Sequence, residues 1–217
     1  TSGTIVVSSG GVTGDATGTI TVGFGALDRI AILDDTNGNG SVIESLSFTT
    51  DESTTMYMAG YDADDNYIRD VKVQWTVQGD IGEVNTGGIY TSSTIFTATT
   101  IGTGVVQADS SVFEDETGII TVSGGSLSYL QIREEGNGGG SIVGDVSLST
   151  DEILTMYAAG YDADDNYLSD QDVSWSVTGT LDAVTNSGSS ITFSPSTSST
   201  SGTIVVSSGG VTGDATG

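Results

Sequence analysis

The chain of 217 residues is long enough for one or two domains, and its composition is that of a folded, strand-rich protein. It has 29 Asp and Glu but only 4 Lys and Arg, so charge repulsion disfavours nucleic acids and anionic membrane surfaces as partners. Because the chain has no Cys, disulfides and thiolate metal sites are excluded.

The predicted elements are short strands, because Gly, Thr, Ser and Val are abundant and Pro195 is the single proline. They are separated by turns rich in Gly, Asn, Asp and Ser. In chain order, the strands of the first complete unit are expected at residues 27–33, 44–49, 54–62, 70–78, 92–98, 103–109 and 118–123. Seven short strands in about 100 residues are typical of an immunoglobulin-like β-sandwich. We therefore expect an all-β protein with essentially no helix.

The fourth predicted strand shows the clearest alternation. In it Val73, Trp75 and Val77 alternate with polar residues, so one face is expected to be buried and the other to face water. The run around Trp175 has the same pattern. Both tryptophans are therefore predicted to lie in the core, although an exposed aromatic side chain that stacks on a sugar is the alternative.

Internal repeats organise the chain. Residues 60–67 recur unchanged at 160–167, and residues 1–18 recur unchanged at 200–217. The second identity predicts that a longer protein repeats a two-domain block. The expected division is the last two strands of a preceding immunoglobulin-like domain (1–24), a complete domain (25–124) and a domain lacking its final strand (125–217). That final strand is expected to resemble residues 19–22.

The run 155–170, followed by 173–177, resembles the bacterial immunoglobulin-like repeats of invasin and intimin type, and the resemblance extends over the whole chain. The sequence departs from the family pattern at Asp65 and Asp165, where Gly is usual. The resemblance implies tandem Greek-key β-sandwiches without cysteine, used as a stalk or display module of a large surface protein. It implies no particular ligand.

A repeated acidic turn is the sharpest chemical feature. Its residues are Asp62, Asp64, Asp65, Asn66 and Asp70 in one copy, and Asp162, Asp164, Asp165, Asn166 and Asp170 in the other. Several hard oxygen ligands in one loop suit calcium, so we predict a calcium site that stiffens the contact between neighbouring domains. The turn is not an EF-hand, because the glycine and glutamate of that loop are missing. A solvated acidic turn without metal is the alternative.

Two further features carry weaker predictions. The loops 34–40 and 134–140 are acidic and rich in Gly and Asn. They are interpreted either as a second cation site or as loops that need positive φ angles, which Gly and Asn adopt readily. Catalysis is not expected, because the chain has no His and no Cys, and nothing in the sequence places two carboxylates in one apolar pocket.

The sequence therefore predicts a structural repeat module of an extracellular stalk or filament, an extended rod with short linkers such as residues 123–126. An adhesin or carbohydrate-binding module that recognises a surface ligand through its loops is the alternative. The expected partners are neighbouring copies in the same chain and laterally associated chains in fibres. No direct membrane insertion is expected, because no apolar run approaches about 20 residues.

Overall fold

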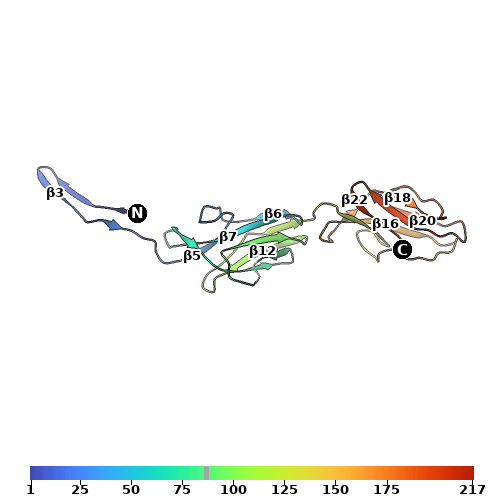
Figure 1. Cartoon of the computed structure of the whole chain (residues 1–217), viewed down its shortest axis with the longest axis horizontal. Helices are drawn as coiled ribbons and strands as arrows, with labels where there is room; N and C mark the ends of the chain where they lie inside the picture. The colour runs from blue at the N-terminus through green and yellow to red at the C-terminus, as the bar shows by residue number, and fades with distance from the viewer. Residues whose placement is uncertain (86–87) are drawn as a thin grey trace.

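The structure is a computed structural model that describes residues 1–85 and 88–217. Two β-sandwiches follow one another along the longest axis, and an N-terminal ribbon extends beyond the first (Figure 1). The described residues contain no helix, so none is present in them that is long and apolar enough to cross a membrane. The predicted all-β, immunoglobulin-like fold is confirmed.

The N-terminal ribbon consists of two antiparallel pairs. Strand β1 (Ser2–Gly3) pairs with β4 (Ile20–Thr21), and β2 (Val6–Ser9) pairs with β3 (Val12–Ala16). Every residue of these four strands is exposed. The ribbon therefore has backbone pairing but no core of its own.

The first sandwich is formed by two sheets. One has the order β10-β11-β7-β5 with β8 also paired to β7: β5 (Arg29–Leu33), β7 (Ser53–Tyr61), β8 (Tyr67–Asp70), β10 (Gly82–Val84) and β11 (Ser93–Ala98). The other has the order β13-β12-β14-β6 with β9 also paired to β12: β6 (Leu46–Thr49), β9 (Gln74–Gln78), β12 (Gly102–Asp109), β13 (Glu114–Glu116) and β14 (Ile120–Ser123). The chain alternates between the sheets in the Greek-key manner.

The core of the first sandwich lies between these sheets. Met58 and Phe96 from one sheet and Trp75 and Val106 from the other belong to one cluster of buried side chains. The indole Nε1 of Trp75 donates a hydrogen bond to the carbonyl of Thr91 at 3.1 Å, which satisfies its only polar atom. The predicted burial of Trp75 is thus confirmed.

The strand predicted at 70–78 is wrong as a single element. Strand β8 ends at Asp70 and pairs with β7, whereas β9 begins at Gln74 and pairs with β12 in the other sheet. Residues 71–73 connect the two sheets. Apolar residues alternate with polar ones without a break through this connection, so the sequence gives no sign of the change of sheet. Strands β8, β10 and β13 were not predicted as separate strands, because segments of three or four residues carry little periodicity.

The second sandwich follows the strand order of the first without counterparts of β6, β10 and β14, and the parallel pairing of β15 with β22 connects its strands into one eight-stranded sheet. Its strands are β15 (Tyr129–Arg133), β16 (Leu154–Tyr161), β17 (Tyr167–Asp170), β18 (Val173–Val177), β19 (Ser187–Gly188), β20 (Ser190–Phe193), β21 (Ile204–Ser208) and β22 (Val211–Ala215). Met156, Trp175, Phe193 and Val206 belong to its core. Trp175 is buried and donates a hydrogen bond to the carbonyl of Gly188 at 2.8 Å, which confirms the second tryptophan prediction.

The identical segments 1–18 and 200–217 form the same hairpin in two environments. Val6 is aligned with Ala16 in the ribbon, and Val205 with Ala215 in the second sandwich. Ile204 is 3% exposed, whereas Ile5, the same position in the ribbon, is 67% exposed. The apolar face of this hairpin is therefore a core face that only the second copy buries.

Candidate functional site

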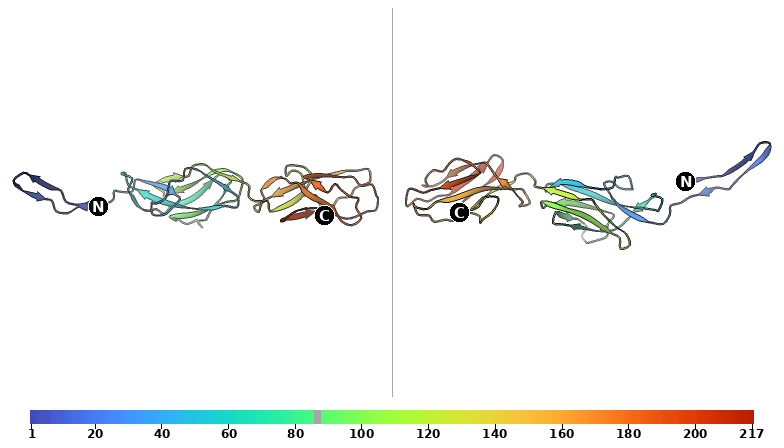
Figure 2. Two further views of the ribbon diagram at one scale, coloured as in Figure 1. Left: turned by 90° about the horizontal axis from the view of Figure 1, so that it is seen from above. Right: turned by 180° about the vertical axis from the view of Figure 1, so that it is seen from behind.

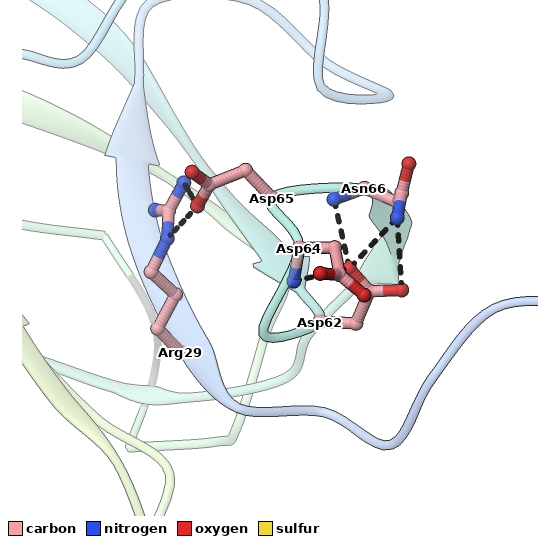
Figure 3. Close-up of polar contacts among 5 residues, drawn as sticks. All are labelled: Arg29, Asp62, Asp64, Asp65 and Asn66. Carbon is pink, nitrogen blue, oxygen red and sulfur yellow. Dashed lines mark hydrogen bonds and ion pairs between the residues drawn. The ribbon is translucent and has the colours of Figure 1, made fainter.

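The acidic turn of the first sandwich is built around the carboxylate of Asp62 (Figure 3). Its Oδ1 accepts hydrogen bonds from the backbone N–H of Asp64 at 3.1 Å and of Asn66 at 2.9 Å, and the Asn66 side-chain amide donates to both carboxylate oxygens. Its Oδ2 also accepts from the N–H of Gly25 at 2.9 Å. The Asp62 carboxylate thus organises the turn after β7 by accepting hydrogen bonds from the backbone of that turn.

The turn requires a left-handed residue at its tip. Asp65 has φ 62° and Asp165 has φ 65°, a conformation that Asp tolerates better than most residues with a β-carbon. The repeats that the sequence resembles usually have Gly at these two positions. Here Asp adopts the left-handed backbone and adds a charge.

Two other predicted ligands of the first turn, Asp65 and Asp70, have partners outside the hydrogen bonds of Asp62. The exposed Asp65 forms an ion pair with Arg29 at 2.9 Å (Figure 3). Asp70 accepts a hydrogen bond from the Tyr67 hydroxyl at 2.8 Å. Burial and the hydrogen bond to Asp70 raise the pKa of Tyr67 to about 12, so this hydroxyl stays a donor at neutral pH. Asp64 is exposed.

The second copy distributes its acidic residues in the same way. Asp162 accepts from the backbone N–H groups of Asp164 and Asn166, as Asp62 does from their counterparts. Asp165 accepts from the Tyr129 hydroxyl at 2.7 Å, and Asp170 accepts from the Tyr167 hydroxyl at 3.1 Å. Each turn therefore joins its first Asp and its Asn by hydrogen bonds, whereas its third and fourth Asp bond to other side chains.

No group of three or more Asp or Glu side chains within residues 1–85 and 88–217 is arranged to hold a metal ion. The oxygens of Asp62 and Asp162 instead accept hydrogen bonds from N–H and hydroxyl donors. Calcium binding stays a prediction. A calcium ion would have to compete with these donors for the first carboxylate of each turn.

The second acidic turn has contacts that the first turn lacks, because it lies against the preceding sandwich. The hydroxyl of Thr50 donates to Asp162 Oδ2 at 2.7 Å, across 112 residues of chain. The side-chain amide of Asn166 donates to the carbonyl of Thr99 at 2.9 Å. Thr50 is 3% exposed and Asp162 is fully buried. Asp162 is therefore the centre of a polar junction between the two sandwiches.

The linker is attached to the same junction. The N–H of Gly125 donates to Asp162 Oδ2 at 3.2 Å, and the N–H of Ser126 donates to Asp51 Oδ2 at 2.8 Å. A β-carbon at Gly124 would overlap the side chain of Leu168, so glycine permits the close approach of the linker to the second sandwich. The backbone that joins the two sandwiches is thus fixed on both sides.

The electrostatics of the junction favour the ionised carboxylate. Burial acts to raise the pKa of Asp162, but hydrogen bonds from the Thr50 hydroxyl and from the N–H groups of Asn166 and Gly125 outweigh it. The pKa of Asp162 therefore lies below its ordinary value. In the first turn, the hydrogen bond from the Gly25 N–H is the main cause that lowers the pKa of Asp62.

The sequence did not single out Thr50, Asp51 or Thr99 as functional residues. Thr50-Asp51 recurs as Thr150-Asp151, and this repeat was the available signal. A Thr-Asp pair at the end of a strand is common, however, and its partner lies in another domain. Only the placement of the two sandwiches identifies it.

The Gly-rich loops adopt the positive φ angles that one interpretation requires. Asn37 and Gly38 have φ 57° and 69°, and their counterparts Asn137 and Gly138 have φ 58° and 70°. Each glycine lies directly against the ring of the tyrosine that begins the following β8 or β17 strand. The turn interpretation is confirmed, and a cation site there stays a prediction.

One cavity of about 650 Å³ lies between the ends of β18, β19 and β21. It is lined by small and polar residues, namely Asp172, Val173, Ser174, Ser187, Gly188, Ser207, Ser208 and Gly209. None of these is an aromatic side chain on which a sugar could stack.

No protein-family model and no curated protein matches the chain. Solved structures that resemble it include domains 4–9 of the surface-layer protein SbsC, at 18% identity and TM-score 0.35, over 99% of this chain and 35% of that one. FdeC, an adhesin of Escherichia coli, matches at 18% identity and TM-score 0.40, over 90% of this chain and 64% of that one.

A C-terminal fragment of intimin, solved in complex with the intimin-binding domain of the translocated intimin receptor, matches at 15% identity and TM-score 0.30. That match covers 88% of this chain and 62% of the fragment. This chain thus spans about a third of the SbsC structure and less than two thirds of the other two. The likeness to these three structures is one of fold alone.

Proposed function

We propose that the chain is a structural repeat module of an extracellular stalk or filament, in which immunoglobulin-like domains follow one another as an extended rod. The observation that carries the proposal is the junction in which Asp162 of one sandwich accepts the hydroxyl of Thr50 of the other at 2.7 Å. The two sandwiches are arranged end to end around it (Figure 2).

The junction restrains bending because it combines a short linker with several bonds. Only residues 124–128 separate β14 from β15, and two of their N–H groups donate to carboxylates on either side of the junction. A hydrogen bond to a buried charged group contributes about 1.5–3 kcal/mol, more than a neutral one. Hinge motion between the sandwiches would break these bonds together.

The charge of the chain suits an exterior location. A formal net charge of −25 keeps such a module soluble and separate from phosphate-bearing surfaces, while salt or divalent cations outside the cell would relieve its self-repulsion. Calcium is part of this proposal as an additional stiffening ion. A non-catalytic role also belongs to it, because each contact described serves packing or the junction.

A receptor-binding role, as for the adhesin and the intimin fragment, would need an exposed recognition surface in addition to the junction. The two tryptophans cannot provide one, because both are buried in the cores. Nothing in the described contacts favours this alternative over the structural role.

Thr50→Val tests the proposal, because it removes the hydroxyl and keeps the shape of the side chain. We expect the fraction of molecules with an open junction to rise about tenfold or more, as loss of a hydrogen bond to a charged group implies. Small-angle scattering should show a broader range of end-to-end lengths. The matched control is Thr150→Val, at the same position of the second sandwich, where the threonine is exposed. An unchanged length distribution in Thr50→Val would contradict the proposal.

A further inference from the structure

The first sandwich shows how its final strand is seated. Strand β14 pairs in parallel with β6, with Ile120 aligned to Leu46 and Val122 to Phe48. The side chains of Ile120 and Val122 are buried in the core. Immediately after the pair, Thr50 and the linker contact Asp162. The strand β14, the turn at Thr50-Asp51 and the acidic turn at Asp162 thus form one continuous junction.

The second sandwich has the residues that correspond to β6, but no strand is paired with them. Glu152 accepts a hydrogen bond from the N–H of Ser149, as Glu52 does from Thr49, so residues 146–149 correspond to β6. They form no strand. They border a cavity of about 330 Å³, whose apolar lining consists of Val143, Val146, Leu148, Leu154, Leu181, Phe193 and Ile204. In its lining, Val143 and Leu148 correspond to Ile43 and Phe48, which pack in one cluster with Ile120 and Val122 of β14 in the first sandwich.

The sequence supplies a segment that fits this groove. The hairpin 200–217 borders it, and the identical hairpin 1–18 is followed by residues 19–22, Thr-Ile-Thr-Val. The corresponding residues 119–122 are Ile-Ile-Thr-Val. Ile20 is 42% exposed and Val22 is 64% exposed. These two side chains stand at the positions that Ile120 and Val122 bury in the first sandwich.

The acidic turn of the first sandwich has the acceptor for a second polar contact of the kind made by Asp162. Gly25 donates to Asp62 Oδ2 at 2.9 Å, as Gly125 donates to Asp162 Oδ2 at 3.2 Å. Asp62 accepts no hydroxyl corresponding to that of Thr50 among the described contacts. Thr150 and Asp151, which correspond to Thr50 and Asp51, are exposed. Donor and acceptor of a second polar contact are therefore both present, at opposite ends of the molecule.

An exposed aromatic residue stands beside this acceptor. Phe24 is 68% exposed and occupies the position of Gly124, which lies against Leu168 in the observed junction. Ile68 stands where the other sandwich has Leu168. A large exposed apolar side chain next to Gly25, which donates to Asp62, is suited to contact with another domain.

We propose that the surface formed by residues 146–151 binds residues 19–25 and the Asp62 turn of a second copy of this two-sandwich block, head to tail. This inference rests on the proposed structural function and identifies the partner of its free surfaces. In the proposed arrangement one hairpin serves both copies. Residues 200–217 of one copy stand where residues 1–18 of the next copy would be, and residue 19 follows residue 217. Ile20 and Val22 fill the groove, Thr150 donates to Asp62, and Phe24 packs at the interface.

The two junctions of the resulting array share their polar chemistry and differ in their apolar contacts. Asp162 and Asp62 each accept a threonine hydroxyl and a glycine N–H. The observed junction has Gly124 against Leu168 with no room for a β-carbon, whereas the proposed junction has the larger Phe24 at that position, so the apolar contacts there differ. Junctions of two kinds therefore alternate along the array.

The test uses a two-copy chain in which residues 1–217 are followed directly by residues 19–217 of a second copy. Thr150→Cys in the first copy and Asp62→Cys in the second place one thiol on each side of the proposed contact. Because the sequence has no Cys of its own, no other intramolecular pair can form. The matched control is the single chain with Thr50→Cys and Asp162→Cys, which tests the junction seen in the structure.

Mild oxidation is expected to close an intramolecular disulfide in both proteins, detected by mass and by mobility on a non-reducing gel. Closure in the control but not in the two-copy chain would overturn the inference and leave the proposed function intact. Because each cysteine pair removes the hydrogen bond of its own junction, closure in neither protein leaves the decision to the melting temperatures described next, for which the junction residues are unchanged.

A second measurement examines the groove itself. Without the cysteines, the second sandwich of the first copy should melt at least 5 °C higher in the two-copy chain than in the single chain, because about 200–300 Å² of apolar surface becomes covered. Ile20→Asp together with Val22→Asp in the connecting segment should abolish this gain. An equal melting temperature in the single and two-copy chains would overturn the proposed strand insertion.

Discussion

Asp62 and Asp162 show how one residue type in one sequence context takes on two roles. Both organise their turn through the N–H groups two and four residues later. Only Asp162 also accepts the hydroxyl of Thr50, because only its turn lies against another sandwich in this chain. The local role follows from the Asp-x-x-x-Asn spacing, and the junction role follows from the position of Asp162 between the two sandwiches.

A residue-scale prediction concerns Asp182, whose carboxylate accepts hydrogen bonds from the N–H and hydroxyl groups of Ser196 and Thr197. The N–H of Ser196 is the main cause that lowers the pKa of Asp182 to about 2. A carboxyl whose pKa is lower in the folded than in the unfolded state stabilises the fold above the unfolded pKa. This stabilisation disappears as the pH falls towards the folded value.

We therefore expect Asp182→Asn to lower the melting temperature at pH 6. Between about pH 4 and pH 2, the melting temperature of the variant should fall less than that of the wild type. Thermal unfolding followed by circular dichroism at several pH values would measure this. Asp172→Asn is the control, because Asp172 is an exposed carboxylate of the same sandwich. Identical pH profiles for wild type and Asp182→Asn would refute the assigned role.

At the scale of elements, a single carboxylate connects the short strand β13 to β5. Asp115 Oδ2 accepts the N–H of Ile32 at 2.7 Å, and Asp214 accepts the N–H of Ile132 at the same distance. Burial is the main cause that raises the pKa of Asp115. The repeat of this contact in both sandwiches identifies it as part of the fold, although no strand was predicted between residues 109 and 118.

Asp115→Leu should therefore lower the free energy of unfolding by about 1–3 kcal/mol, because the buried N–H of Ile32 loses its acceptor. Asp115→Asn keeps an acceptor oxygen and removes a charge that burial disfavours, so its effect should stay within about 1 kcal/mol. Urea unfolding of the two variants measures the difference. Equal destabilisation by Leu and Asn would show that the hydrogen bond is not the cause.

At the scale of the whole molecule, the net charge of −25 and the predicted calcium sites have separable effects. Screening of self-repulsion should raise the melting temperature in NaCl without regard to the cation. Calcium that binds the turns should raise it further at equal ionic strength, and a chelator should reverse that part. The additional increase should be smaller in a variant with Asp64→Asn and Asp164→Asn. Equal melting temperatures in the two salts would contradict the calcium prediction.

The sequence by itself determined the features that depend on local spacing and on repetition. The alternation around Trp75 identified a buried face. The recurrence of residues 60–67 at 160–167 indicated repeated units, and Asp and Asn indicated the turns. A side chain in a strand points to a face set by its position in a period of two, so neighbouring residues are sufficient to predict it.

Only the tertiary structure decided which residues meet across the molecule. The bond between Thr50 and Asp162, the parallel pairing of β14 with β6 and the contact from Asp115 to Ile32 join segments that lie 112, 74 and 83 residues apart. These contacts depend on how sheets stack and how one sandwich lies against the next. Such placement results from the sum of many packing contacts, and no local period in the sequence records it.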